Sequence, residues 1–278
     1  TRLKKPIGFM LLFWPCAWGL TLAYDFSNEI NVYIFYLILF FLGSLLMRSA
    51  GCIVNDILDK DFDKKVFRTK SRPLATDAIS TKLAILYVVI LCFMALLVLL
   101  NFNFITIILA LLSMPLAFTY PLMKRFTYWP QLFLGITFNY GLILGWTSIS
   151  NELNIIAIIF YFAAIFWTLG YDTIYGYQDI KDDEIIGLKS TSIKFKGNAK
   201  KFLSTCYLLS IFLLICGGYL MDFKFYYFIF LSLPILHLVI YQIRTFDIEK
   251  PDICLKVFKS NNLFGLIILI NIFLGKLV

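Results

Sequence analysis

Two clusters of polar oxygens stand out because their spacing matches one face of a helix. In the first, Asn55, Asp59 and Asp63 follow one another at intervals of four residues, and Asp56 lies beside Asn55. Residues four apart on a helix point the same way. The second cluster has similar helical spacing and comprises Asp172, Tyr175, Asp179 and Asp183. Each cluster is therefore predicted to present its oxygens as one row.

Carboxylates gathered on one face repel one another unless a cation lies between them. Mg²⁺ suits such a position because it prefers oxygen ligands and is commonly shared with a substrate phosphate. Two rows facing each other across a cavity would hold Mg²⁺ and a diphosphate, and the metal would neutralise charge on the leaving group. The predicted metal ligands are Asn55, Asp59, Asp63, Asp179 and Asp183, and the four aspartates are also the predicted catalytic residues.

A solvated loop rich in charge is the usual meaning of such a run. Here both clusters end apolar helices on the same side, which favours a functional site over that interpretation.

Cations accompany both clusters, and Arg and Lys are the usual partners of phosphate groups. We predict that Arg72 and Lys124 bind the diphosphate. Most of the remaining cations near the clusters are expected to orient the protein in a membrane; they include Lys64, Lys65, Arg68, Lys70, Lys181, Lys189 and Lys194. Lys189 and Asp56 are candidates for a supporting role.

Arg48 is a separate case because it lies within an apolar stretch. It precedes Asn55 by seven residues, on the same helix face and about 10 Å deeper. An ionisable group at that depth is either functional or part of an internal ion pair, and the sequence leaves both readings open.

The elements that must position these residues are membrane-spanning helices. Of 278 residues, 60% are hydrophobic and 15% are charged, and the mean hydropathy is +0.83. Apolar runs long enough to cross a hydrocarbon core of about 30 Å recur along most of the chain. We predict an all-α polytopic membrane protein whose residues 1–278 form a single domain. The nine predicted helices are 7–23, 32–53, 82–100, 104–122, 130–147, 154–177, 202–220, 225–243 and 257–277.

The charges are sorted between the two sides of the predicted bundle. Although the net charge is +8, the cations lie in short loops between apolar runs, which indicates membrane orientation and not nucleic-acid binding. The cation-rich side is expected to be cytoplasmic. It holds the N-terminus with Arg2, Lys4 and Lys5 and both acidic loops. An odd number of spans places the C-terminus on the opposite side.

Other catalytic classes lack the residues that they need. The one histidine, His237, is far from the acidic loops, and the six cysteines form no CxxC pair. A zinc site or a Ser-His-Asp triad is therefore excluded, and no phosphate-binding P-loop pattern occurs. The chemistry must come from carboxylates, metal and cations.

At these residues the sequence resembles the UbiA superfamily of intramembrane prenyltransferases, most closely the bacterial branch that acts on 4-hydroxybenzoate. The resemblance runs from Arg2 to about Gly265. The segments that carry it are RLKKPIGFMLLFWPCAWGL from Arg2, RSAGCIVNDILDKDFDKKVFRTKSRPL from Arg48, YPLMKRFTYWPQLFLG from Tyr120, YDTIYGYQDIKDDEIIGLKSTSIKF from Tyr171 and NNLFG from Asn261.

The resemblance implies nine helices around a central cavity open sideways to lipid, in a bacterial inner (cytoplasmic) membrane. It implies a Mg²⁺-dependent enzyme of ubiquinone biosynthesis with two substrates, polyprenyl diphosphate and 4-hydroxybenzoate. A polyprenyl group, expected to be octaprenyl, would move to the ring carbon ortho to the hydroxyl, and diphosphate would be released.

The same resemblance assigns roles to individual residues. Asn55, Asp59 and Asp63 match the first Mg²⁺–diphosphate motif of the superfamily. Asp179 and Asp183 match the second, with Asp172 and Tyr175 just ahead of it. Arg72 and Lys124 match diphosphate-binding positions, and Arg125 stands where a cation could meet the carboxylate of the aromatic acceptor.

Three alternatives stay open. The first is a sister enzyme that prenylates a dihydroxynaphthoate, homogentisate or haem. The second is a secondary transporter, although its acids would line a midplane pathway and not helix ends. The third is an alcohol phosphotransferase, whose D-x-x-D-G-x-x-A-R pattern needs glycine where this chain has Lys60.

Overall fold

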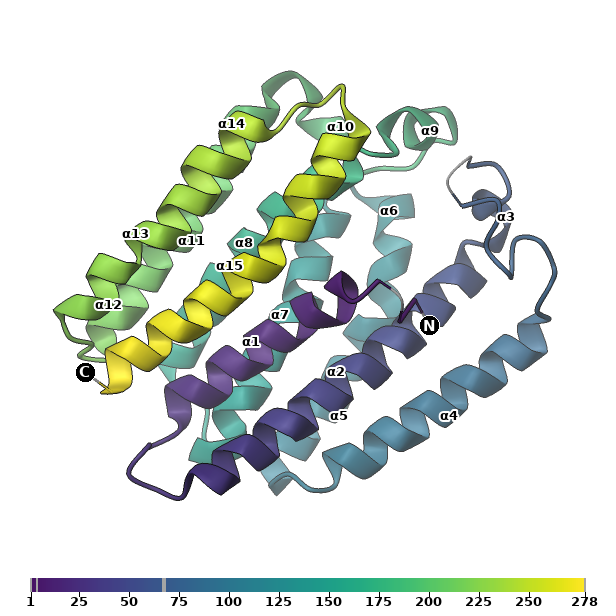
Figure 1. The fold of residues 1–278 in the computed structure, drawn as a ribbon. Coiled ribbons are helices and arrows are strands. Elements are labelled where there is room, and N and C mark those ends of the chain that lie inside the picture. Colours follow the sequence, from purple (N-terminus) through teal and green to yellow (C-terminus); the bar gives the residue numbers. More distant parts are fainter. Residues whose placement is uncertain (1, 4, 67–68, 278) are drawn as a thin grey trace.

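The computed structural model describes residues 2–3, 5–66 and 69–277, and this part of the chain contains helices and no strands (Figure 1). Lys4 and Arg68, both counted among the loop cations, lie outside the described residues. The elements are α1 (Ile7–Ala23), α2 (Ile30–Leu58), α3 (Lys60–Asp63), α4 (Thr81–Leu99), α5 (Phe104–Thr119), η1 (Tyr120–Leu122), α6 (Met123–Phe126), α7 (Pro130–Ser150), α8 (Ile155–Gly176), α9 (Ile180–Ile185), α10 (Thr191–Lys194), η2 (Lys196–Asn198), α11 (Ala199–Leu220), α12 (Phe225–Phe230), α13 (Ser232–Ile235), η3 (Leu236–Gln242), α14 (Ile243–Thr245) and α15 (Pro251–Leu277).

The predicted all-α membrane fold is confirmed. Within the described residues, eight helical segments are long and apolar enough to cross a membrane, and α1 is a shorter apolar helix. These segments match the nine predicted spans, with three main differences. The last helix, α15, begins at Pro251, six residues before its predicted start. The second helix is longer than predicted and runs to Leu58. The predicted helix 225–243 is divided into α12, α13 and η3, of which η3 is a π-helix.

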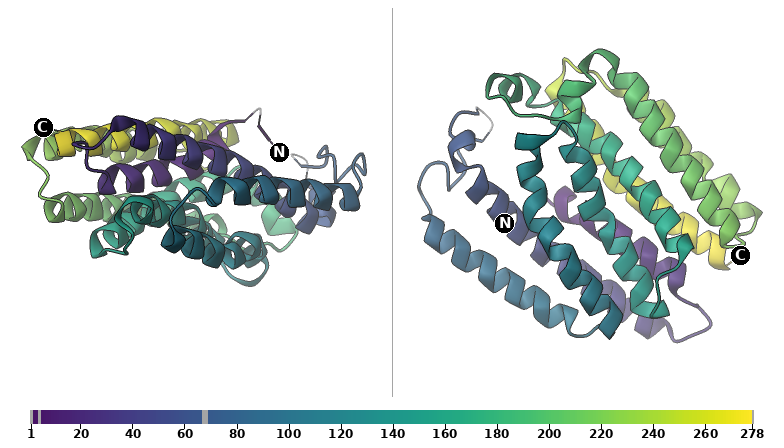
Figure 2. Two further views of the ribbon diagram at one scale, coloured as in Figure 1. Left: turned by 90° about the horizontal axis from the view of Figure 1, so that it is seen from below. Right: turned by 180° about the vertical axis from the view of Figure 1, so that it is seen from behind.

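The helices lie in two layers (Figure 2). In the view of Figure 1, α1, α2 and α15 form the front, with α5, α7 and α8 behind them. Helices α7 and α8 are mostly buried, whereas α4 buries only Ala84 among its residues. On α4, side chains such as Val89 and Phe93 are more than half exposed. An apolar helix exposed in this way is suited to contact with lipid.

Helices α1 and α7 approach closely because small residues line their contact. An ideal Cβ built on Gly145 would lie 2.3 Å from the carbonyl oxygen of Cys16, and one on Gly19 would lie 2.0 Å from that of Leu142. Both obstacles are backbone atoms, so they cannot rotate away. Small residues allow such close approach between membrane helices, where packing and not water exclusion drives association.

Replacing Gly145 with alanine should therefore destabilise the bundle by about 1–3 kcal/mol, because the added methyl group forces α1 and α7 apart. Thermal unfolding of the purified protein in detergent would measure this. Gly43→Ala is the matched control, since a Cβ on Gly43 of α2 meets nothing within 4 Å. Equal unfolding temperatures for the two variants would contradict the packing argument.

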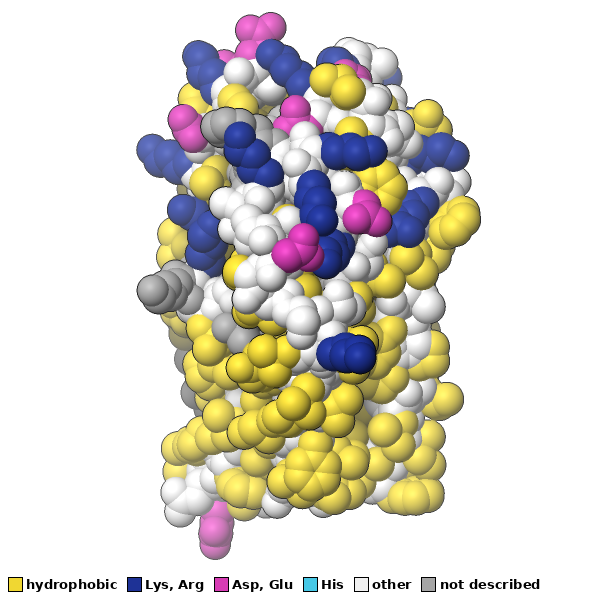
Figure 3. Space-filling view, turned by 90° about the vertical axis from the view of Figure 1, so that its right-hand side faces the viewer, with side chains coloured by type: hydrophobic (Ala, Val, Ile, Leu, Met, Phe, Trp, Pro, Cys, Tyr) yellow, Lys and Arg dark blue, Asp and Glu magenta, His cyan; other side chains and the backbone are white. Residues whose placement is uncertain are grey.

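The two ends of the bundle differ in charge. Figure 3 shows Lys, Arg, Asp and Glu side chains gathered toward one end of the face in view, with hydrophobic side chains over most of the rest. Arg2 pairs with Asp56, which places the N-terminal segment at the acidic end. Lys276 donates to the carbonyl oxygen of Leu22 at 2.7 Å, which ties the end of α15 to the end of α1. The two termini therefore lie at opposite ends.

Candidate active site

The first acidic motif straddles the end of α2. Asn55 and Asp56 belong to its last turn, and Asp59 follows its last residue. The backbone departs from helical geometry at Asp59, with φ −100° and ψ 7°, and α3 then begins at Lys60. The N–H of Asp63 donates to the carbonyl oxygen of Asp59 at 2.8 Å, so the four-residue spacing survives the break. Asp59 and Asp63 are buried, at 2% and 6% exposure.

The second motif has the same construction at the end of α8. The helix stops at Gly176, Asp179 precedes α9, and Asp183 lies within α9. Here the N–H of Asp183 donates to the carbonyl oxygen of Asp179 at 2.9 Å. A side chain at position 176 would collide with the hydroxyl of Ser192, because a Cβ there would lie 2.4 Å from it. Glycine thus allows the chain after α9 to fold back against α8.

Buried hydrogen bonds fix this returning segment. The hydroxyls of Thr173 and Thr191 are 2.6 Å apart, and the amide oxygen of Gln131 accepts from the N–H of Thr191 at 2.9 Å. The N–H of Lys189 donates to the carbonyl oxygen of Lys124 at 2.8 Å. The segment that follows the second motif therefore also holds α6, which carries Lys124. Lys189, predicted as a supporting residue, contributes through its backbone.

One polar cavity receives side chains from both motifs. All five predicted metal ligands line it, together with Tyr175. Arg2, Arg72, Lys124 and Thr69 complete its polar lining. The structure thus brings together residues that lie up to 181 positions apart in the sequence, from Arg2 to Asp183. Asp56 adjoins this group through its ion pairs. Asp172 and Arg125 line neither this polar cavity nor a second, apolar cavity that lies between α2, α4, α5 and α7.

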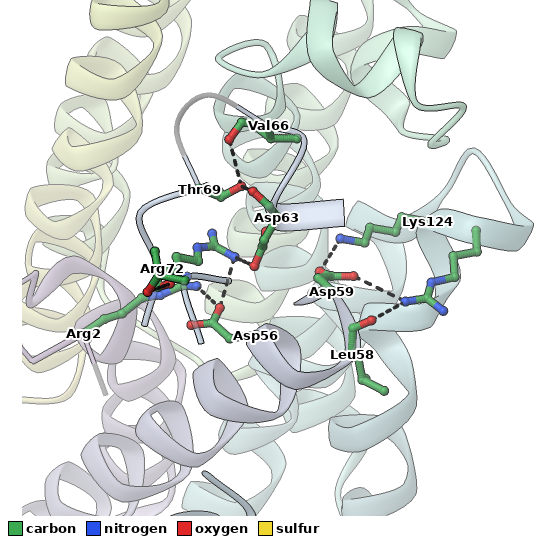
Figure 4. A network of polar contacts seen from close by, with 11 residues as sticks. Arg2, Asp56, Leu58, Asp59, Asp63, Val66, Thr69, Arg72 and Lys124 are labelled. Carbon is green, nitrogen blue, oxygen red and sulfur yellow. Dashed lines mark hydrogen bonds and ion pairs between the residues drawn. The ribbon is translucent and has the colours of Figure 1, made fainter. Parts of the chain in front are cut away.

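Cations neutralise the first motif directly (Figure 4). Lys124 pairs with Asp59, and the Nη1 of Arg72 lies 2.7 Å from Asp63 Oδ2 and 3.1 Å from Asp56 Oδ1. Burial raises the pKa of Asp63 above its ordinary value, and the neighbouring Arg72 opposes that shift. The two predicted diphosphate-binding cations are therefore held at the metal-ligand candidates themselves.

Arg2 is a member of this group that the sequence-based assignment missed, because it was counted only among the orienting cations. Its guanidinium pairs with Asp56, which also contacts Arg72. Arg125, the predicted partner of the acceptor carboxylate, instead pairs with the first motif, because its Nη2 lies 3.6 Å from Asp59 Oδ1. Its Nη2 donates to the carbonyl oxygen of Leu58 at 2.6 Å, and its guanidinium lies over the ring of Phe62.

The oxygen atoms of the two motifs suit a Mg²⁺ ion that is shared with substrate better than one whose ligands all come from the protein. Within residues 2–3, 5–66 and 69–277, no three His, Cys, Asp or Glu side chains are close enough to hold a metal. The Oδ1 atom of Asp59 is buried without a hydrogen-bond partner. Mg²⁺ typically takes one or two carboxylates and completes its shell with water and substrate phosphate. Oxygen ligands on opposite walls fit that arrangement.

The second, apolar cavity begins about one helical turn from the polar cavity, toward the N-terminal end of α2. This chamber lies between α2, α4, α5 and α7 and encloses about 1290 Å³, including space that opens to the outside. Arg48 lines its polar end. The guanidinium carbon lies 5.2 Å from the centre of the Phe138 ring, and the buried Nε has no hydrogen-bond partner. Asp172 and Tyr120 are among the groups that interact with it electrostatically.

Residues 12–268 match the UbiA prenyltransferase family. This chain belongs to that family. It is 45% identical over 277 residues to a bovine mitochondrial 4-hydroxybenzoate polyprenyltransferase, covering 99% of this chain and 74% of the relative. It is 42% identical over 278 residues to 4-hydroxybenzoate geranyltransferase 2 of Lithospermum erythrorhizon, covering 99% and 89%.

Solved structures of the UbiA family share the fold. An apo UbiA homolog from Aeropyrum pernix K1 superposes with a TM-score of 0.80 at 24% identity, covering 100% of both chains. A UbiA homolog from Archaeoglobus fulgidus, bound to GPP and Mg²⁺, gives a TM-score of 0.70 at 19% identity, covering 100% of this chain and 99% of that one.

The predicted family is therefore confirmed, as is the multi-pass membrane fold. The predicted bacterial inner membrane conflicts with the comparison, because the bovine relative is named as mitochondrial.

Proposed function

We propose that this protein is a Mg²⁺-dependent 4-hydroxybenzoate polyprenyltransferase of ubiquinone biosynthesis. It transfers a polyprenyl group from polyprenyl diphosphate to the ring carbon ortho to the hydroxyl and releases diphosphate. The observation that carries the proposal is the succession of two cavities along α2, a charged one lined by both acidic motifs and an apolar one below it. The names of the relatives, which share this acceptor, support the same reaction.

The polar cavity suits the diphosphate. Mg²⁺ bound there by Asn55, Asp59 and Asp63 on one wall and by Asp179 and Asp183 on the other would neutralise the leaving group. The Archaeoglobus fulgidus homolog with GPP and Mg²⁺ supports this cofactor. Arg72, Lys124 and Arg2 each reach the same cavity, and their charges favour the diphosphate as it takes the electron pair of the breaking C–O bond.

The acceptor is expected at the junction of the two cavities. There the ring carbon beside the phenol hydroxyl attacks the allylic carbon, and loss of the ring proton restores the aromatic ring. Arg48 is the cation at that junction, and its guanidinium lines the chamber, where it can offer N–H donors to the carboxylate of the acceptor. We therefore propose Arg48 as the carboxylate partner, ahead of Arg125, which pairs with Asp59 and contacts Leu58 and Phe62.

The apolar chamber suits the tail and the reacting carbon. A developing allylic cation needs shelter from water, which an apolar wall provides, and ring faces such as that of Phe138 favour positive charge. An octaprenyl tail stays a prediction, since the relatives include both a polyprenyltransferase and a geranyltransferase. The single domain over 1–278 and the cytoplasmic position of the acidic end are likewise parts of this proposal.

The decisive assay combines membranes containing the protein with Mg²⁺, 4-hydroxybenzoate and a labelled polyprenyl diphosphate, and identifies the product by mass. The expected product is the acceptor plus one prenyl group. A product only from a dihydroxynaphthoate, homogentisate or haem would indicate the sister activities. Movement of label across liposomes without a new product would indicate a transporter.

Removing divalent metal should stop turnover. Chelation with EDTA is expected to abolish product formation, because the carboxylates then have no shared cation through which to hold the diphosphate, and added Mg²⁺ should restore it. The reading is the rate of product formation before and after Mg²⁺ is returned. Full activity in excess EDTA would contradict the metal assignment.

A further inference from the structure

The end of the apolar chamber remote from the acidic motifs is closed by aromatic rings. Phe102 and Phe40 both line the chamber, and their ring centres are 4.8 Å apart. Tyr36 packs on the other side of this pair, with its ring 5.4 Å from that of Phe102. Phe40 and Tyr36 come from α2, whereas Phe102 lies in the turn between α4 and α5.

Phe102 is held in this position by its neighbours. Asn101 donates to the carbonyl oxygen of Leu97 on α4 at 2.9 Å. Asn103 caps the start of α5 and donates to the carbonyl oxygens of Thr147 at 2.8 Å and Ser148 at 3.0 Å, at the end of α7. The turn is therefore tied to helices on both sides, and its aromatic side chain is directed into the chamber and not into the surroundings.

The rings of Phe40, Phe102 and Tyr36 form the floor of the chamber. The distance from the acidic motifs to this floor follows from the residue spacing along α2. Asn55 and Phe40 both belong to α2 and are separated by fifteen residues, which correspond to about 22 Å at 1.5 Å per residue. One isoprene unit adds four chain bonds of about 1.5 Å each, which project to roughly 4.5 Å along an extended tail. A tail whose diphosphate lies at Asn55 thus reaches the floor with about five isoprene units.

We propose that Phe102, supported by Phe40, is a determinant of tail length in this protein. The floor contacts long prenyl tails and is not reached by short ones. A tail that meets it turns outward between α4 and α5, because α4 packs mainly on α2. This inference rests on the proposed prenyl transfer. It adds the position along the tail beyond which the protein distinguishes long tails from short ones.

The test compares Phe102→Ala with the wild-type protein on geranyl, farnesyl and octaprenyl diphosphates, with 4-hydroxybenzoate as acceptor. For the two short donors, kcat/KM should stay within two-fold of wild type, since their tails end before the floor. For the octaprenyl donor it should fall by about ten-fold, the effect of one lost apolar contact with substrate. Phe102→Leu, which keeps a smaller apolar side chain, should give a weaker loss with the same dependence on length.

Phe104→Ala is the matched control, because Phe104 begins α5 two residues away and is 75% exposed on the outer surface. It should leave the ratio of long to short donors unchanged. An equal change for all three donors in Phe102→Ala, or the same length dependence in Phe104→Ala, would overturn the proposal. Wild-type protein without product from any donor would instead refute the proposed function.

Discussion

Asp59→Asn should reduce prenyl transfer by roughly a thousand-fold or more, since a metal-held leaving group is worth several kcal/mol and each 1.4 kcal/mol is ten-fold in rate. Asp59 is almost fully buried, one of its oxygens pairs with Lys124, and the other has no hydrogen bond but lies 3.6 Å from Arg125 Nη2. The amide keeps the size of the side chain and removes the charge. Initial rates at saturating substrates and millimolar Mg²⁺ would measure the loss.

Asp61→Asn is the matched control for this variant. Asp61 belongs to the same short helix, α3, but is exposed and lines neither cavity. Its amide should keep wild-type activity, and both variants should be recovered from membranes in equal amounts. Normal turnover by Asp59→Asn would remove the metal assignment, whereas equal losses in both variants would point to general charge at this end of the bundle.

Arg48→Ala should raise the KM for 4-hydroxybenzoate by roughly ten- to hundred-fold, which corresponds to the loss of one charge-assisted hydrogen bond. The KM for the prenyl diphosphate should stay near wild type, because Arg48 lines the apolar chamber and not the polar cavity. Steady-state kinetics with each substrate varied in turn separates the two effects. Arg48→Lys keeps the charge but loses the planar guanidinium, so its KM for 4-hydroxybenzoate should lie between those of wild type and Arg48→Ala.

Two comparisons make this prediction specific. With 4-hydroxybenzyl alcohol, an acceptor that lacks the carboxylate, wild type and Arg48→Ala should perform alike. Arg125→Ala should leave the acceptor KM nearly unchanged. If instead Arg125→Ala raised that KM and Arg48→Ala did not, the original assignment of Arg125 would hold and the one proposed from the chamber would fail.

Much of the framework follows from patterns that act locally. The four-residue spacing of Asn55, Asp59 and Asp63 required that α2 continue beyond its apolar run, and it does so to Leu58, with α3 beyond. Helix α1 has the predicted bounds, Ile7–Ala23, because hydropathy and helix length are both local properties. The meeting of the two acidic motifs was predictable because both end helices on one side of a membrane.

Features set by tertiary contacts were not predictable in the same way. Arg2 resembles any loop cation until the fold places it beside Asp56, 54 residues away. Lys124 and Arg125 are consecutive in α6 and both pair with Asp59, but only Lys124 lines the cavity. The π-helix η3 gives no signal in hydropathy. Its last residue, Gln242, bonds to Tyr207 and Asn261 on neighbouring helices.

The polar cavity and the apolar chamber are neighbours along α2, and this arrangement has a consequence for where substrates enter and products leave. Both water-soluble molecules of the proposed reaction, the small aromatic acid and the freed diphosphate, have their binding groups at the same end of α2. The tail and everything attached to it stay at the level of the hydrocarbon. The products would thus be sorted by solubility at the moment of their formation, one to the aqueous phase and one to the bilayer, and neither would need to cross the membrane.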